Sequence, residues 1–175
     1  MTLRISFELD DDDLRHFQLI MDEARRAASR MAPEDIVAAA ENLLSEVPES
    51  GTPGFILDRL DKLRLMIRML SDIEWRLPHS DAARVLNALA YFAEPEDLIP
   101  DHIPGLGFLD DAIMIELVVR ELKHEVEAYN DFCDYRDRQS GNGHGASRAS
   151  WLDARRKELQ ARMRRRRRRG GHLFR

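Results

Sequence analysis

Seven prolines divide this chain into segments that carry apolar residues at helical spacing. They are Pro33, Pro48, Pro53, Pro78, Pro95, Pro100 and Pro104. A proline inside a helix removes a backbone hydrogen bond and clashes with the preceding turn, so helices are expected between these positions. No proline falls inside a stretch whose apolar residues recur at steps of three and four. The proline spacing therefore predicts a series of separate helices.

Five stretches show this helical spacing, at 14–31, 36–47, 56–70, 85–92 and 108–133. The last is the longest, and its steps of four and three from Phe108 to Cys133 predict one long helix. Thr52 followed by Pro53 suits the start of another helix. We predict an all-α fold, a bundle of about five helices with a short N-terminal extended segment and a basic C-terminal tail.

The first residues break the helical period. Leu3, Ile5, Phe7 and Leu9 alternate with polar residues, and this alternation is typical of a strand. Three interpretations stay open: an extended arm on the bundle, pairing with the same strand of a second copy in a homodimer, or a first helical turn. The N-terminus also lacks a long apolar stretch, so we expect no secretory signal peptide.

The charges of the chain are separated along the sequence. Residues 148–175 carry 12 Lys and Arg against two acidic residues, a net charge of +10, whereas the remainder carries −15. Three glycines in the stretch SGNGHGAS predict a flexible linker. We therefore divide the chain into a helical body at 1–139, a linker at 140–147 and a basic tail at 148–175, partly helical or disordered.

Residues 97–112 read DLIPDHIPGLGFLDDA and form a compact connection before a helix start. Pro100 and Pro104 restrict the residues before them to extended backbone, and Gly105 and Gly107 permit a positive φ. These four residues are the predicted structural motif of the loop. Because the loop is rich in apolar side chains, we expect it to pack on the bundle.

This segment resembles the signature of the YkvA-like family, a bacterial domain of unknown function. With its lead-in, the resemblance covers about residues 85–125, and it implies no established activity. Some members of the family are predicted to be membrane-associated. In this chain the longest charge-free run of the following helix is Ala112 to Ile115. Because crossing a bilayer needs about 20 apolar residues, we predict no transmembrane helix here.

Four carboxylates in and after the loop are candidate metal ligands: Asp97, Asp101, Asp110 and Asp111. Oxygen ligands on a tight loop suit Mg²⁺ or Ca²⁺. The structural alternative is that the first two carboxylates bond loop amides and the last two begin the helix, where negative charge suits the dipole. The metal interpretation implies a divalent cation and a metal-dependent protein or enzyme, and the structural one implies no cofactor. The pattern identifies no catalytic residue.

Six adjacent arginines are the candidate polyanion-binding residues: Arg164, Arg165, Arg166, Arg167, Arg168 and Arg169. Because like charges repel, we expect this run outside the core. Its candidate partners are RNA, DNA and an anionic membrane surface, bound without sequence specificity. The alternatives are docking on the acidic body and a solubilising tail with no fixed partner.

The sequence thus favours a soluble bacterial interaction module without enzymatic activity, whose arginine tail engages an anionic partner. The single cysteine, Cys133, allows no intramolecular disulfide and suits the cytoplasm. Because the basic tail can bind anionic lipids, a peripheral position at the inner membrane is the second predicted localisation.

Overall fold

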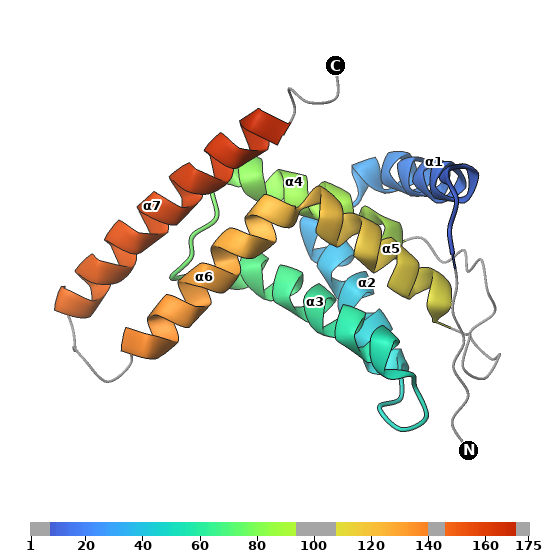
Figure 1. The fold of residues 1–175 in the computed structure, drawn as a ribbon, viewed down its shortest axis with the longest axis horizontal. Coiled ribbons are helices and arrows are strands. Elements are labelled where there is room, and N and C mark those ends of the chain that lie inside the picture. Colours follow the sequence, from blue (N-terminus) through green and yellow to red (C-terminus); the bar gives the residue numbers. More distant parts are fainter. Residues whose placement is uncertain (1–7, 94–107, 140–145, 171–175) are drawn as a thin grey trace.

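The computed structural model describes residues 8–93, 108–139 and 146–170, which form a helical bundle (Figure 1). Its α-helices are α1 (Asp11–Ala27), α2 (Pro33–Glu46), α3 (Gly54–Ser71), α4 (His79–Leu89), α5 (Leu109–Glu121), α6 (Lys123–Gln139) and α7 (Ala146–Gly170). Two short 3₁₀ segments, η1 (Ala28–Arg30) and η2 (Ala90–Ala93), follow α1 and α4. The described residues contain no strand. The all-α prediction is confirmed, with seven α-helices in these ranges where about five were expected.

Local chemistry accounts for the helix starts. At α1 the Asp13 amide donates to Asp10 Oδ1 over 2.8 Å, and the Asp10 amide donates to Asp13 Oδ2 over 3.1 Å. This reciprocal capping satisfies two backbone donors that have no partner within the helix. Pro33 begins α2, where its missing N–H costs nothing.

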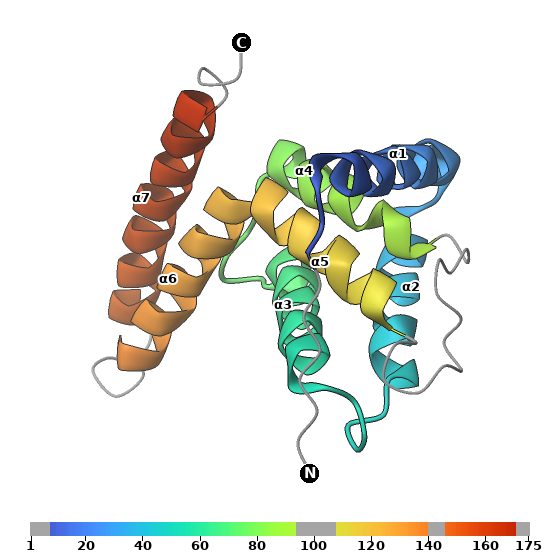
Figure 2. The same ribbon diagram turned by 45° about the vertical axis from the view of Figure 1, so that its right-hand side comes forward.

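The core lies where α5 crosses α3 and where η2 packs against α1 and α2 (Figure 2). Its largest fully buried side chains include Trp75, Tyr129 and Phe132, whose rings contact one another. Trp75 lies in the connection between α3 and α4, and the other two rings come from α6. This aromatic cluster therefore fixes α6 against the end of α3.

The predicted long helix from Phe108 to Cys133 is two helices, so that expectation was wrong. Leu122 separates α5 from α6 with φ −97° and ψ 22°. Its amide still donates to the Val118 carbonyl, and its carbonyl still accepts from the Val126 amide, both over 2.9 Å. Because the chain keeps these local hydrogen bonds, the apolar period continues through the break. The change of direction lets α5 pack on α3 while α6 packs on α7.

Three sequence predictions fall wholly or largely outside the described residues. They concern the N-terminal alternation at 3–9, the loop motif and most of the linker. Leu9 is described and has no regular secondary structure. Pro100, Pro104, Gly105 and Gly107 are not described, so their proposed roles stay predictions.

Residues 146–170 form one 25-residue helix, α7, which lies along α6 in both views (Figures 1 and 2). Leu152, Leu159 and Met163 are buried and belong to the same apolar core as the rest of the bundle. Their spacing of seven and four residues places them on one side of the helix. The basic segment is thus packed on the body through its apolar side.

Candidate functional site

The arginine run forms the last two turns of α7, and helical geometry divides it between two faces. Arg164 and Arg167 point inward and make ion pairs with the body. Arg165, Arg168 and Arg169 are exposed, and none of them makes an ion pair with another residue in the described ranges. Spacings of three and four residues place each set on its own side. The run therefore presents one paired face and one exposed face.

The inward face binds two buried carboxylates, Asp81 of α4 and Glu125 of α6, which we call the acidic pair. Arg167 Nη1 lies 2.9 Å from Asp81 Oδ1 and 3.0 Å from Glu125 Oε1. Arg164 Nη2 lies 3.2 Å from Asp81 Oδ2, and Arg84 Nε lies 3.0 Å from Glu125 Oε1. Each carboxylate side chain is only 1% exposed. Three guanidinium groups thus surround two carboxylates.

The close approach of the two carboxylates means that the acidic pair depends on the positive charge of the arginines around it. Two carboxylates in contact with one nitrogen repel each other, so they need positive charge beside them. Burial also lowers the pKa of Arg167, but its hydrogen bonds to Asp81 and Glu125 raise the pKa above its ordinary value. Arg167 therefore stays charged and, together with Arg84 and Arg164, offsets the two negative charges of the acidic pair.

Two further ion pairs join the C-terminal half of α7 to α6. Arg166 Nη1 lies 3.4 Å from Glu127 Oε2, and Arg162 pairs with Asp131. The carboxylates of both pairs are more than 40% exposed. Exposed pairs of this kind contribute little to stability, so the acidic pair is the main ionic contact of the arginine run.

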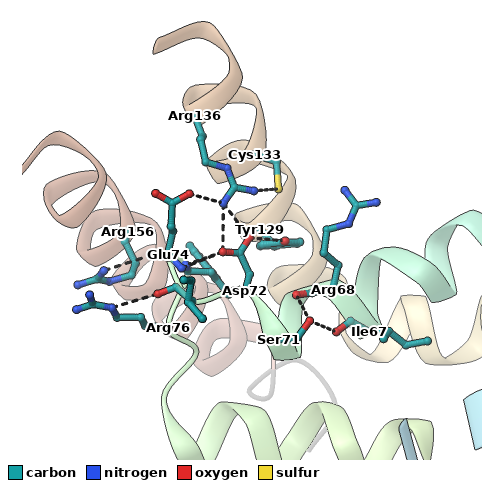
Figure 3. A network of polar contacts seen from close by, with 12 residues as sticks. Ile67, Arg68, Ser71, Asp72, Glu74, Arg76, Tyr129, Cys133, Arg136 and Arg156 are labelled. Atoms are coloured by element: carbon teal, nitrogen blue, oxygen red, sulfur yellow. Dashed lines mark hydrogen bonds and ion pairs between the residues drawn. The ribbon is translucent and has the colours of Figure 1, made fainter. Parts of the chain in front are cut away.

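A second carboxylate cluster, centred on Asp72, holds the turn formed by residues 72–76 (Figure 3). Asp72 Oδ1 accepts hydrogen bonds from the Glu74 amide over 3.0 Å and the Trp75 amide over 3.2 Å. The Tyr129 hydroxyl donates to Asp72 Oδ2 over 2.7 Å, and Arg136 Nη1 donates to the same oxygen over 2.9 Å. Asp72 therefore holds the turn through two backbone amides and joins the end of α3 to α6 through Tyr129 and Arg136.

The same turn binds the N-terminal half of α7. Gln160 Nε2 donates to the Trp75 carbonyl over 2.8 Å, and Arg148 Nη1 lies 2.6 Å from Glu74 Oε2. Arg156 Nη1 donates to the Glu74 carbonyl over 3.4 Å, a contact drawn in Figure 3. The turn ends at Arg76 with a left-handed φ of 49°. A non-glycine residue adopts this backbone only where its surroundings hold it, and here α7 is part of those surroundings.

The Asp72 cluster also sets the protonation of its members. Burial raises the pKa of Asp72, but hydrogen bonds from Tyr129 and Arg136 outweigh it and leave the pKa below the usual 3.8. Burial raises the pKa of the Cys133 thiol above its usual value. A protonated thiol is a poor nucleophile, so the geometry favours a structural role for Cys133.

The four candidate metal ligands are only partly described. Asp110 and Asp111 lie in the first turn of α5 and are buried, whereas Asp97 and Asp101 lie outside the described residues. Across residues 8–93, 108–139 and 146–170, no group of three or more His, Cys, Asp or Glu side chains is arranged to hold a metal ion. The four-carboxylate site therefore stays a prediction.

A cavity of about 450 Å³ lies on another part of the molecule, between the start of α1, α3 and α5. Apolar side chains, Phe55 and Leu117 among them, line most of it. Its charged residues are paired with one another: Glu116 lies 3.3 Å from Arg59 Nε and 3.2 Å from Arg120 Nε. Across the lining residues that the structure describes, Arg59, Glu116 and Arg120 are the only charged side chains.

Sequence reasoning identified the arginine run but missed Asp72, Asp81 and Glu125. A signal for Glu125 was present, because it lies three residues after Leu122 and four before Tyr129, on the apolar side of the helix. A carboxylate on an apolar side needs a buried cation. Nothing in the sequence identifies Arg167 as that cation.

Comparisons with known proteins agree with the resemblance of the loop. The family model described as "Protein of unknown function (DUF1232)" matches residues 82–117. The "Uncharacterized membrane protein YkvA" of Bacillus subtilis (strain 168) is 36% identical over 76 residues, which cover 40% of this chain and 70% of the relative. The chain belongs to the YkvA-like family. No solved structure matches it significantly.

The family model covers most of α4 and most of α5, but neither Asp81, Glu125 nor α7. The acidic pair and the arginine run thus lie outside residues 82–117, the part of this YkvA-like chain that the family model matches. Among the described residues, no helix combines the length and the apolar character that crossing a membrane requires.

Proposed function

We propose that this YkvA-like protein is a non-enzymatic interaction module that places an arginine-rich helix against an anionic membrane surface. The observation that carries the proposal is the exposed face of α7, where Arg165, Arg168 and Arg169 make no ion pair within the described residues. The other face of the same helix is fixed to the body by apolar and ionic contacts. The body therefore holds the three charges in one orientation.

The charge of this face favours binding to an anionic surface. A basic residue near an anionic lipid surface contributes about 1 kcal/mol, so three arginines supply roughly 3 kcal/mol. Salt screens such contacts over about 10 Å at 0.1 M, so the binding is expected to weaken as ionic strength rises.

Two observations favour a membrane over a nucleic acid. Trp151 is 40% exposed and precedes Arg165 by 14 residues and Arg169 by 18. These separations are close to four and five turns of about 3.6 residues, so the indole lies on the same side of α7 as Arg165 and Arg169. Tryptophan is favoured at the membrane–water interface. The Bacillus relative is itself named a membrane protein. We propose a peripheral position at the cytoplasmic side of the inner membrane.

Vesicle binding tests this function. The triple variant Arg165→Gln, Arg168→Gln, Arg169→Gln is compared with wild type on vesicles of phosphatidylglycerol and phosphatidylcholine. From the charge lost, we expect its affinity to fall about 100-fold. A control variant with the same charge change, Arg26→Gln, Arg30→Gln, Lys62→Gln, alters exposed residues of α1, η1 and α3 that make no ion pair in the described ranges.

Two results would contradict the membrane proposal. One is an equal loss of affinity in the two triple variants, which would mean that net charge alone governs binding. The other is binding of wild type to single-stranded RNA without binding to anionic vesicles, which would assign the exposed face to nucleic acid.

A further inference from the structure

The C-terminal end of α7 differs from the rest of the helix in what holds it. Met163 is the last buried apolar side chain, and residues 164–170 are six arginines and one glycine. We call these residues the arginine end. Its described contacts with the body include the ion pairs of Arg164, Arg166 and Arg167. The arginine end is therefore held mainly by charge, whereas the preceding turns add apolar packing and the Gln160 hydrogen bond to their ion pairs.

The arginines that bind the acidic pair also face solvent. The side chains of Arg164 and Arg167 are 38% and 30% exposed, whereas the carboxylates that they bind are 1% exposed. A second anion can approach these guanidinium groups from the solvent side. Such an anion competes with Asp81 and Glu125 for the same charge.

We propose that the acidic pair and an anionic membrane surface compete for Arg164 and Arg167, so that membrane binding releases the arginine end from the body. This inference rests on the proposed function, and it adds regulation of the same site. In the docked state the surface meets the three exposed arginines. In the released state it also meets the inner ones, while Leu152, Leu159 and Met163 keep the rest of α7 in place.

The competition has a thermodynamic consequence. Because binding linkage is reciprocal, whatever weakens docking of the arginine end strengthens its binding to the surface, by at most the same factor. Loss of one carboxylate of the acidic pair should therefore raise membrane affinity by more than the change in net charge explains. The acidic pair acts as an internal competitor that limits binding to weakly charged membranes.

The first experiment measures affinity for vesicles of phosphatidylglycerol and phosphatidylcholine. We expect Asp81→Asn to bind at least threefold more tightly than Glu41→Gln, a control with the same charge change at an exposed residue of α2. Glu127→Gln removes the half-exposed carboxylate that pairs with Arg166. It should also raise the affinity for vesicles, but by less than Asp81→Asn. It keeps the test decisive if Asp81→Asn fails to fold. The proposal would be overturned if Asp81→Asn bound vesicles no more tightly than Glu41→Gln. If Asp81→Asn does not fold, equal affinity of Glu127→Gln and Glu41→Gln would overturn it instead.

The second experiment follows amide hydrogen exchange in the wild-type chain. On binding to anionic vesicles, exchange should accelerate at 164–170 and stay slow at 152–163. Increased protection at 164–170 would overturn the release. If wild type binds no anionic vesicle, the proposed membrane function fails. Docking of the arginine end by charge is then tested by amide exchange at NaCl concentrations from 0.05 to 0.5 M. Exchange at 164–170 should accelerate with salt, and unchanged rates would overturn docking by charge as well.

Discussion

Two carboxylate clusters attach α7 to the body, and they do so in different ways. Asp72 accepts two backbone amides, a tyrosine hydroxyl and one arginine, all with defined directions. Within the described residues, the carboxylates of Asp81 and Glu125 accept hydrogen bonds only from arginine side chains. The first cluster therefore constrains geometry, whereas the second mainly balances charge.

The difference explains why the Asp72 cluster is suited to holding the fold, whereas the acidic pair is suited to exchange, in which its arginine partners contact other anions instead. A carboxylate that caps backbone amides determines the path of the chain, and no mobile ion replaces those directed bonds. A carboxylate bound only by flexible guanidinium groups depends on the charge around it and hence on salt and competing anions. We expect the Asp72 cluster to behave as part of the core and the acidic pair to respond to its surroundings.

The largest expected effect is at Asp72. The change Asp72→Ala removes four hydrogen-bond acceptor contacts and leaves Arg136 without its buried carboxylate, so unfolding should become easier by about 3 kcal/mol. Urea denaturation measures it, with the exposed Asp58→Ala as control. A loss below about 1 kcal/mol would remove the proposed structural role of this cluster.

A smaller effect is expected at the acidic pair. Arg167→Gln leaves two buried carboxylates with less compensation and should destabilise the fold by about 2 kcal/mol, whereas Arg168→Gln on the exposed face should cost less than about 0.5 kcal/mol. In a double-mutant cycle, Arg167→Gln and Asp81→Asn should couple by about 1–3 kcal/mol. Additive effects would mean that the two groups do not stabilise each other.

The effect of pH should distinguish the clusters further. Burial raises the pKa of Asp72, but its hydrogen bonds outweigh this, and hydrogen bonding to Arg148 lowers that of Glu74, so both lie below their usual 3.8 and 4.5. In acid the unfolded chain then binds more protons than the folded one. The stability contributed by these groups is present above about pH 4.5 and is lost as pH falls through their folded values.

Urea midpoints between pH 7 and pH 3 measure this loss. Asp72→Asn should flatten the acid part of the curve, because its amide does not titrate. An identical pH dependence in the variant and wild type would show that other carboxylates govern acid denaturation.

Much of the fold could be predicted from the sequence because helix formation is governed by nearby residues. Prolines and apolar spacing located the helical segments, and the capping residues are local as well. The same local character explains why the break at Leu122 was not predicted. Hydrogen bonds and apolar period both persist across that residue, so only packing against α3 on one side and α7 on the other separates α5 from α6.

The arginine run shows what the sequence determined and what it left open. Six adjacent arginines determine a strongly basic segment, whatever the fold. Which of them are paired was decided by the tertiary structure, because Asp81 lies 83 and 86 residues before Arg164 and Arg167, and Glu125 lies 42 residues before Arg167. Charge attraction has no sequence register of its own. Only the packing of α4, α6 and α7 brings these groups within 3.2 Å and leaves Arg165, Arg168 and Arg169 exposed.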